Sequence, residues 1–146
     1  MLRALDIPPV WLGLALAVSW ALSRLWAWPL PGIGLALIGL GVALMLAAVA
    51  QMLASRTTFI PRRNPSALVT TGVFRISRNP IYLADAVILT GAILYWGALI
   101  ALPVIPAFMS LIMQRYIRDE ENRLRSGFGM EYSTWAARVG RWVGPL

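Results

Sequence analysis

The stretch from Ile33 to Leu53 contains no charged residue and is almost entirely apolar. A helix needs about 20 apolar residues to cross the hydrocarbon core of a bilayer, so this stretch is long enough to span a membrane. Its glycines, Gly34, Gly39 and Gly41, indicate close packing against another helix. The composition agrees, since 59% of the residues are hydrophobic and 13% are charged, against about 25% charged in soluble domains. These values favour a membrane protein and exclude a disordered chain.

Four apolar stretches predict an all-α bundle of about four transmembrane helices. They cover residues 9–28, 33–53, 81–96 and 98–117. Little more than Gly97 separates the last two, which predicts a tight helical hairpin. Pro103 and Pro106 are expected to kink the fourth helix unless they lie in its first turn. We interpret the whole chain, residues 1–146, as a single integral-membrane domain.

The distribution of arginines predicts the orientation. All 13 basic residues are arginines, and Arg24, near the far end of the first span, is the one that falls on the opposite side of the membrane. The others lie at Arg3, in the polar connector 55–79, and from Arg115 onward. Cytoplasmic loops carry the excess of positive charge, so we expect a multi-pass protein with both termini in the cytoplasm. Because the arginines adjoin apolar stretches, they favour a membrane surface as the partner and not a nucleic acid.

The residue types that the chain lacks exclude several kinds of chemistry. There is no cysteine, histidine or lysine. This excludes disulfides, thiolate nucleophiles, Cys/His zinc sites, histidine bases and lysine Schiff bases. We therefore expect no metal site.

A first polar cluster lies where the third span begins, at Arg75, Arg78, Asn79, Pro80, Tyr82 and Asp85. Pro80 suits the first turn of a helix, and Asn79 is a good N-cap. One interpretation is a capped helix start with interfacial side chains. The other is an anion site at the helix N-terminus.

A second polar cluster lies at the end of the fourth span, at Gln114, Arg118, Glu120 and Glu121. Helical spacing predicts that Gln114, Arg118 and Glu121 share one face. The plain interpretation is a solvated helix end with an Arg118–Glu121 pair. The alternative is that the carboxylates hold a cation or hydroxyl groups such as those of a ribose.

Asp85 lies inside the third span, roughly 7–8 Å along the helix from Pro80. An ionisable group inside a span is costly, which points to a function. The alternatives are that it reaches the interface or pairs with Arg78 or Arg118.

Two separated motifs carry a family resemblance. The chain resembles the isoprenylcysteine carboxyl methyltransferase and phospholipid methyltransferase superfamily in two segments. These are LVTTGVFRISRNPIYL (Leu68–Leu83) and Arg118–Trp142, with an apolar hairpin between them. Members of that superfamily are integral-membrane enzymes that use S-adenosylmethionine. The motifs occur in the right order and spacing over about the second half of the chain, and their style suggests a bacterial inner-membrane protein.

The resemblance implies a cofactor pocket and a lid over it. The implied pocket residues are Arg78, Asn79, Pro80, Tyr82, Leu83, Glu120 and Glu121. The implied C-terminal lid is the segment 118–146, with Phe128, Gly129, Tyr132, Arg141 and Trp142. The chain departs from the family pattern at three positions: Asn79 replaces the histidine of the eukaryotic prenylcysteine enzymes, Ala84 replaces a glycine and Trp135 replaces a tyrosine. The first departure weakens the case for a prenylated protein as acceptor.

Methyl transfer from a sulfonium requires alignment and the exclusion of water, and it needs no metal or histidine. The resemblance therefore implies methylation of a lipid-like acceptor at the cytoplasmic leaflet, with S-adenosylhomocysteine as product. The expected acceptor is a phospholipid amine, a carboxylate or thiol of the isoprenylcysteine type, or a small hydrophobic thiol. Glu121 is the first candidate for a cofactor contact. Glu120 or Asp85 would take the proton of an amine, and Arg78 or Arg118 would orient a carboxylate.

Two other classes of protein compete with this hypothesis. A small four-helix multidrug-type exporter has a similar architecture, but it needs a carboxylate in the middle of a span. The first span has none, and Asp85 lies near an end of the third span. A non-enzymatic membrane scaffold would not need Arg, Asn, Tyr and Glu clustered at one level of the membrane.

Overall fold

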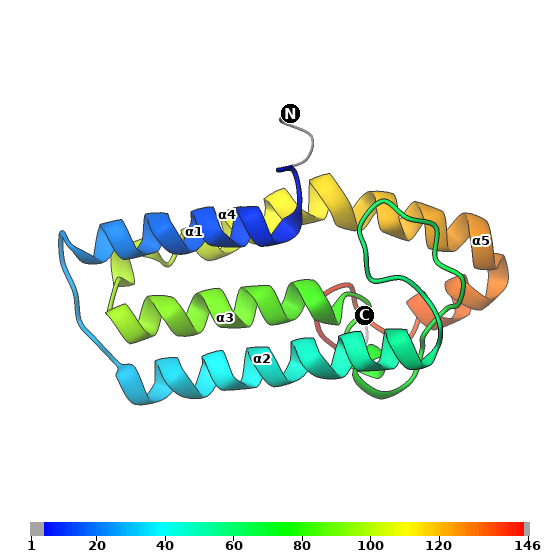
Figure 1. Ribbon diagram of the computed structural model, residues 1–146, viewed down its shortest axis with the longest axis horizontal. Coiled ribbons are helices and arrows are strands. Elements are labelled where there is room, and N and C mark those ends of the chain that lie inside the picture. The colour runs from blue at the N-terminus through cyan, green and yellow to red at the C-terminus, as the bar shows by residue number, and fades with distance from the viewer. Residues whose placement is uncertain (1–4, 145–146) are drawn as a thin grey trace. The chain divides into compact units, whose positions relative to one another are not determined.

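The computed structural model describes residues 5–144, which contain helices and connecting segments and no strand (Figure 1). This confirms the all-α prediction. Arg3 and the last two residues of the predicted lid lie outside the described residues. The elements are α1 (Pro8–Ser23), α2 (Pro31–Ala54), η2 (Gly72–Arg75), α3 (Pro80–Trp96), η3 (Leu99–Ala101), α4 (Val104–Ile112), the π-helical turn η4 (Met113–Ile117) and α5 (Arg118–Ala136).

Among residues 5–144, two helical stretches contain an apolar window long enough to cross a membrane, α2 and the continuous stretch Leu99–Ala136. Only 17% of the apolar window of α2 is buried, whereas the core helix of a soluble protein is mostly buried. The other two apolar helices, α1 and α3, have 16 and 17 residues and are shorter than this test requires. By length and composition, therefore, two of the four predicted spans are present.

Prolines set several helix boundaries. Pro8, Pro31 and Pro80 each stand at the first position of a helix, where the missing N–H would have no partner in any case. Pro103 directly precedes α4, and Pro106 lies in the first turn of α4, so both occupy positions that do not kink the helix.

The predicted first span, residues 9–28, is too long, because α1 ends at Ser23. The segment after α1 leaves the helical path, and the N–H of Trp28 donates to the carbonyl of Gly97 at 2.8 Å. Pro29 and Pro31 follow at once, so the chain cannot continue as a helix there.

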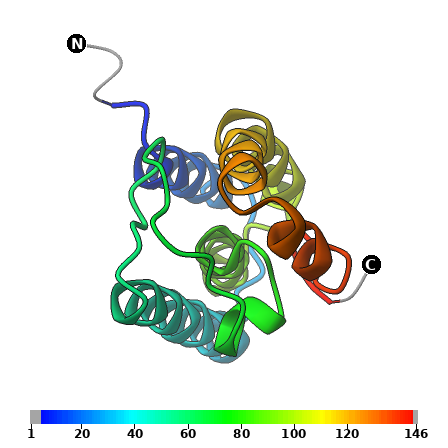
Figure 2. The ribbon, with the colours of Figure 1, turned by 90° about the vertical axis from the view of Figure 1, so that its right-hand side faces the viewer.

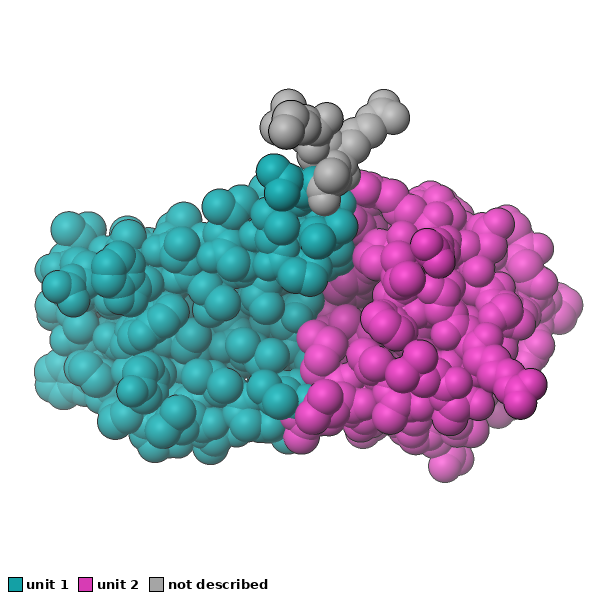
Figure 3. Space-filling model, viewed as in Figure 1, with its two compact units in different colours: residues 1–42, 84–112 teal, residues 43–83, 113–146 magenta. Residues whose placement is uncertain are grey.

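The chain forms two compact units, coloured separately in Figure 3. Unit 1 comprises residues 1–42 and 84–112, and unit 2 comprises residues 43–83 and 113–146. The interpretation of residues 1–146 as one domain stays a prediction.

In unit 1 the helices run side by side, seen lengthwise in Figure 1 and nearly end-on in Figure 2. α1 packs against η3 and α4. α2 approaches α3 so closely that a Cβ on Gly34 would lie 2.5 Å from the backbone nitrogen of Tyr95, and a Cβ on Gly41 would lie 2.6 Å from the side chain of Ile88. Gly39 faces open space. Two of the three glycines that predicted close packing therefore make the contact.

Unit 2 has a core built from the end of α2, the connector and the C-terminal segment. Trp135 is central to it, because its indole Nε1 donates to the carbonyl of Phe74 at 3.1 Å. Its ring meets the ring of Tyr132 edge-on, with the centroids 5.9 Å apart. The buried members of this core are Ala48, Val69, Phe74, Tyr132, Trp135 and Val139. These contacts fasten the end of α5 onto the connector.

α5 consists of two helical segments that meet at a kink. The helix continues to Ala136, with a kink at Gly129, whose backbone has φ 50° and ψ −117°. The kink redirects the last turns of α5 without separating them, and this brings Tyr132 and Trp135 onto the core.

Candidate functional site

The centre of the candidate site is the carboxylate of Glu121, whose side chain is only 7% exposed. The guanidinium of Arg141 binds it with two hydrogen bonds of 2.8 Å, from Nε to Oε1 and from Nη2 to Oε2. The Nη1 of Arg78 lies 3.8 Å from Oε1. The hydrogen bonds to Glu121 hold the pKa of Arg141 above its ordinary value. A buried carboxylate is thus compensated by two cations, as burial of a charge requires.

Main-chain contacts hold Arg141 in this place. Its carbonyl accepts hydrogen bonds from the amide Nδ2 of Asn79 at 3.0 Å and from the hydroxyl of Ser77 at 3.4 Å. The backbone N–H of Arg78 donates to the carbonyl of Gly140 at 3.0 Å. The segment that follows α5 is therefore bonded to the residues that precede α3.

The guanidinium of Arg78 is only partly satisfied. Its Nη1 donates to the hydroxyl of Tyr132 at 3.1 Å. Its Nε is buried and is the one buried side-chain N or O atom without a hydrogen-bond partner in the described part of the chain. Burial, followed by the nearby charge of Glu121, raises the pKa of Tyr132. Because a buried unpaired N–H is costly, this donor marks a place for an acceptor.

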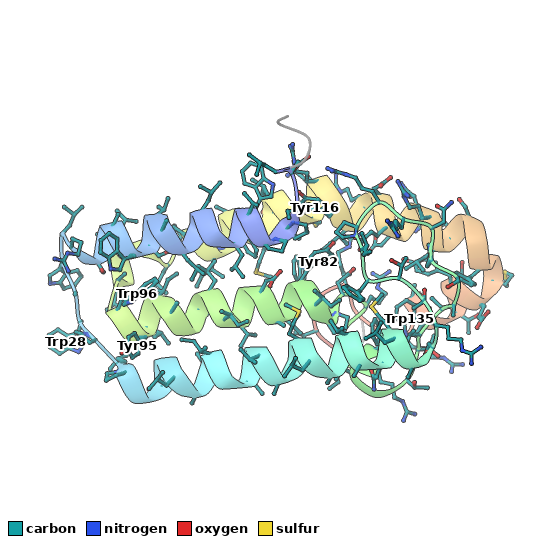
Figure 4. The ribbon with its side chains drawn as sticks, in the orientation of Figure 1. Trp28, Tyr82, Tyr95, Trp96, Tyr116 and Trp135 are labelled. Atoms are coloured by element: carbon teal, nitrogen blue, oxygen red, sulfur yellow. The ribbon has the colours of Figure 1, made fainter. Side chains whose placement is uncertain are left out.

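A second contact joins the start of α3 to the start of α5. The hydroxyl of Tyr82 donates to Oε1 of Glu120 at 2.6 Å. The rings of Tyr82 and Tyr116 are stacked at 6.4 Å between centroids, and both are labelled in Figure 4. The guanidinium carbon of Arg62 lies 5.2 Å from the centroid of Tyr116. Glu120 lies beyond the apolar stretch that ends at Ile117, and burial raises its pKa to about 7.

The predicted shared face of Gln114, Arg118 and Glu121 is wrong. Gln114 and Arg118 are exposed, whereas Glu121 is buried and pairs with Arg141 and Arg78. The cause is η4, because a π-helical turn contains an extra residue and shifts every later side chain around the helix axis.

Most of the remaining residues that the resemblance implied also lie in unit 2. Asn79 occupies the N-cap position of α3, since its carbonyl accepts the N–H of Leu83 at 2.9 Å. Pro80 is fully buried at the first position of α3, and Leu83 is half-buried. Phe128 packs against the core of unit 2, and Trp142 is half-buried.

Asp85 is the candidate that does not join this group. It is buried in α3 and belongs to unit 1. We therefore leave Asp85 outside the site. Its role stays a prediction.

Sequence reasoning missed three contributors to the site. The hydroxyl of Ser77 donates to the carbonyl of Arg141, and the sulfur of Met113 accepts a hydrogen bond from Arg141 Nη1 at 3.5 Å. The ring of Tyr116 stacks on the ring of Tyr82. Tyr116 lies at the end of the fourth predicted span, where an aromatic residue is typical of the membrane interface, so its stacking on Tyr82 had no specific signal. Ser77 and Met113 carry no specific signal either.

The arrangement suits a ligand that carries both signs of charge. Arg78 Nε is available to an anionic oxygen, and guanidinium–carboxylate hydrogen bonds are among the strong ones. Glu120 offers acceptor oxygens to hydroxyl or ammonium groups. The faces of Tyr82, Tyr116 and Tyr132 supply surfaces on which a cation or a flat ring can lie.

A model of the phospholipid methyltransferase family matches residues 31–131. This range is more than half of the chain and contains α2, α3, α4 and both carboxylates, Glu120 and Glu121. The chain belongs to the phospholipid methyltransferase family. The resemblance predicted from the two motifs is thereby confirmed. A comparison with curated proteins finds no match.

The phospholipid methyltransferase family is one of membrane methyltransferases that act on lipid-like substrates. Membership favours an enzyme over the exporter and the scaffold. The match includes Arg78, Asn79 and Tyr82 and ends before Tyr132 and Arg141. The contacts of Glu121 and Arg78 extend the matched part of the site into the C-terminal segment.

Proposed function

We propose that this protein transfers a methyl group from S-adenosylmethionine to a lipid-like acceptor at the cytoplasmic leaflet. The observation that carries the proposal is the meeting of three chain segments in unit 2. Residues 77–82, 113–121 and 132–141 supply two arginines, two carboxylates and three tyrosines to one polar cluster. The family supplies the reaction class, and the cluster supplies groups that suit the proposed donor.

The donor set fits S-adenosylmethionine on three grounds. The unpartnered Nε of Arg78 would bind the carboxylate of the methionine part. Glu120 would accept hydrogen bonds from ribose hydroxyls or from the amino group. The tyrosine faces would adjoin the sulfonium or the adenine, because aromatic faces attract cations and stack on rings. When bound, S-adenosylmethionine supplies a methyl group on a positively charged sulfur that leaves as a neutral thioether.

The protein's own part in the reaction is to hold and orient the two substrates and to exclude water from the polar cluster. Glu121 and Arg141 lock the C-terminal segment against the start of α3, which shields the polar cluster from water. For an amine acceptor, each new N–C bond requires the loss of one N–H proton, and we assign that proton to the carboxylate of Glu120. For a carboxylate acceptor, Arg78 would orient the nucleophilic oxygen.

We further propose four membrane crossings with both termini in the cytoplasm. α1 and α3 would cover about 24 and 26 Å as helices, slightly less than a hydrocarbon core of about 30 Å. Tryptophans and the segment beyond α1 would cover the remaining depth at the interface. The single Arg24 on one side and the many arginines on the other support this orientation.

The deciding experiment uses purified protein in vesicles of bacterial lipids with methyl-labelled donor. Phosphatidylethanolamine, a farnesylated cysteine analogue and a long-chain thiol are offered separately, and the labelled product is identified by mass spectrometry. We expect one of the three to be labelled, and we expect Arg78→Gln to reduce the rate at least tenfold. Glu131→Gln, a change at an exposed carboxylate of the same helix as Glu120, is the matched control. Absence of label in all three, with saturable S-adenosylhomocysteine binding also absent, would refute the proposal.

A further inference from the structure

Unit 1 contains a second polar feature, a hollow at the end where α1 finishes and α3 finishes. It is a concavity that is open to the surroundings, with a volume of about 580 Å³. It is lined from three segments of the chain, chiefly by Trp20, Ser23, Arg24, Pro29, Tyr95 and Trp96.

The walls of the hollow are fixed by the backbone. The N–H groups of Trp28 and Leu30 donate to the carbonyls of Gly97 and Leu94 at 2.8 and 2.9 Å. Gly97 has φ +69°, and a Cβ there would lie 2.1 Å from the backbone of Trp28, so only glycine permits this approach. Figure 4 labels Trp28, Tyr95 and Trp96 at this end. The concavity is thus built by the fold itself.

The charge of the hollow is positive. Arg24 is the one basic residue among residues 5–42 and 84–112, the described part of unit 1. Its guanidinium carbon lies 5.6 Å from the ring centroid of Trp20, which orients an otherwise exposed side chain. None of the described residues that line the hollow carries a carboxylate. The hydroxyl of Ser23 donates to the carbonyl of Trp20, so Arg24 is the group that would meet an anion.

The surroundings of the hollow are apolar and exposed. Leu25, Trp26 and Trp28 are 77%, 55% and 64% exposed. Tryptophan rings favour the level of the lipid headgroups, where one side of the ring is apolar and the other is wet. A cation set among such rings is placed to meet an anion that is itself attached to acyl chains.

We propose that this hollow binds the phosphodiester of a membrane phospholipid, with Arg24 on the phosphate and the aromatic rings along the glycerol and upper acyl chains. The inference rests on the proposed membrane crossings, which put this end at the interface opposite the arginine-rich segments. It does not rest on methyl transfer. Free phosphate carries the same kind of anionic group as a phospholipid but has no acyl chains. A comparison of the two ligands therefore shows which of them the hollow binds.

The test measures lipid retention by native mass spectrometry of delipidated protein in detergent. The probes are phosphatidylglycerol, a diacylglycerol with the same acyl chains but no phosphate, and inorganic phosphate. The variants are Arg24→Gln, Arg24→Lys and, as the matched control, Arg63→Gln, which removes an exposed arginine of the connector.

We expect phosphatidylglycerol to be retained more than the diacylglycerol, and Arg24→Gln to weaken its retention about tenfold or more. Arg24→Lys should keep most of the retention because it keeps the charge, and Arg63→Gln should behave as the original protein. Equal retention by Arg24→Gln and the original protein would overturn the site. Equal retention of diacylglycerol and phosphatidylglycerol would also overturn it, and equal affinity for inorganic phosphate would overturn the lipid as its source. Unfolding temperatures of all variants show whether any loss reflects misfolding.

Discussion

The guanidinium of Arg141 binds both carboxylate oxygens of Glu121, each at 2.8 Å. The same residue accepts a hydrogen bond on its carbonyl from Asn79. Arg141 therefore joins the start of α5 to the start of α3. Loss of either contact should loosen the polar cluster as a whole, because the groups share partners.

Replacement of Glu121 by glutamine should weaken both folding and cofactor binding. Removing one partner of a fully buried ion pair costs roughly 3–5 kcal/mol. The side chain of Arg141 is 35% exposed, so we expect a smaller loss of about 2 kcal/mol in the free energy of unfolding. Calorimetry with S-adenosylhomocysteine should show affinity reduced at least tenfold, in protein that keeps its helical circular dichroism.

The matched control for Glu121 is Glu131→Gln, which changes an exposed carboxylate of the same helix. It should leave both the unfolding temperature and the affinity within error of the original protein. Unchanged affinity in Glu121→Gln would remove Glu121 from the site.

Glu120 should make stability depend on pH. Burial raises its pKa from 4.5 to about 7, so the folded state favours the protonated carboxyl. The stabilisation from protonation is then complete below about pH 4.5 and is lost as the pH rises through about 7. The difference is at most about 3–4 kcal/mol, since one pKa unit corresponds to about 1.4 kcal/mol. Thermal unfolding in detergent from pH 4 to 9 measures it.

Two variants identify Glu120 as the titrating group. Glu120→Gln should remove its share of the slope. The hydrogen bond from Tyr82 lowers the pKa of Glu120. Tyr82→Phe removes this bond and should therefore raise the pKa of Glu120 and move the slope to higher pH. An unaltered slope in both variants would assign the titration to another residue.

The kink in α5 should be sensitive to the residue at position 129. The backbone of Gly129 has φ 50° and ψ −117°, which a residue with a Cβ adopts only at a cost of about 1–3 kcal/mol. Gly129→Ala should lower the unfolding temperature although the site has open space. Gly127→Ala, which also meets nothing within 4 Å, should raise it slightly, because alanine favours the helix by about 1 kcal/mol. Equal effects would show that the kink does not require glycine.

The approach of α2 to α3 should respond to Gly34 and not to Gly39. A Cβ at position 34 would lie 2.5 Å from the backbone of Tyr95, whereas position 39 is open. Gly34→Ala should therefore destabilise the protein by about 1–3 kcal/mol, and Gly39→Ala should be neutral or stabilising. Thermal unfolding of the two variants in the same detergent is the measurement, and a neutral Gly34→Ala would contradict the close packing.

The parts of the fold that the sequence predicted are those with a local cause. The apolar stretches and the Asn79–Pro80 pair predicted the helices and the start of α3, since capping and proline geometry act within a few residues. The end of α1 was misplaced because apolar residues continue to Trp28. The hydrogen bond from the N–H of Trp28 to the carbonyl of Gly97 takes the segment after Ser23 off the helical path. It joins residues that are distant in sequence, so no local pattern predicts it.

The candidate site shows the same division. Arg78, Tyr82, Glu120 and Glu121 stand in recognisable motifs, and the structure brings them into one unit. The π-helical turn η4 has no signal in the residue pattern, so the helical face drawn through Gln114 and Arg118 was wrong. The unsatisfied Nε of Arg78 depends on packing from every side and is visible only in three dimensions.

The hydrogen bonds that Ser77 and Asn79 donate to the carbonyl of Arg141 have a consequence for biosynthesis. The partners are more than sixty positions apart along the chain, so neither contact can form until residue 141 has left the ribosome. A nascent chain halted before that point would already carry its apolar helices, while Glu121 would still lack its Arg141 partner. The contacts of Arg141 with Ser77, Asn79 and Glu121 therefore form only after the apolar helices have been synthesised.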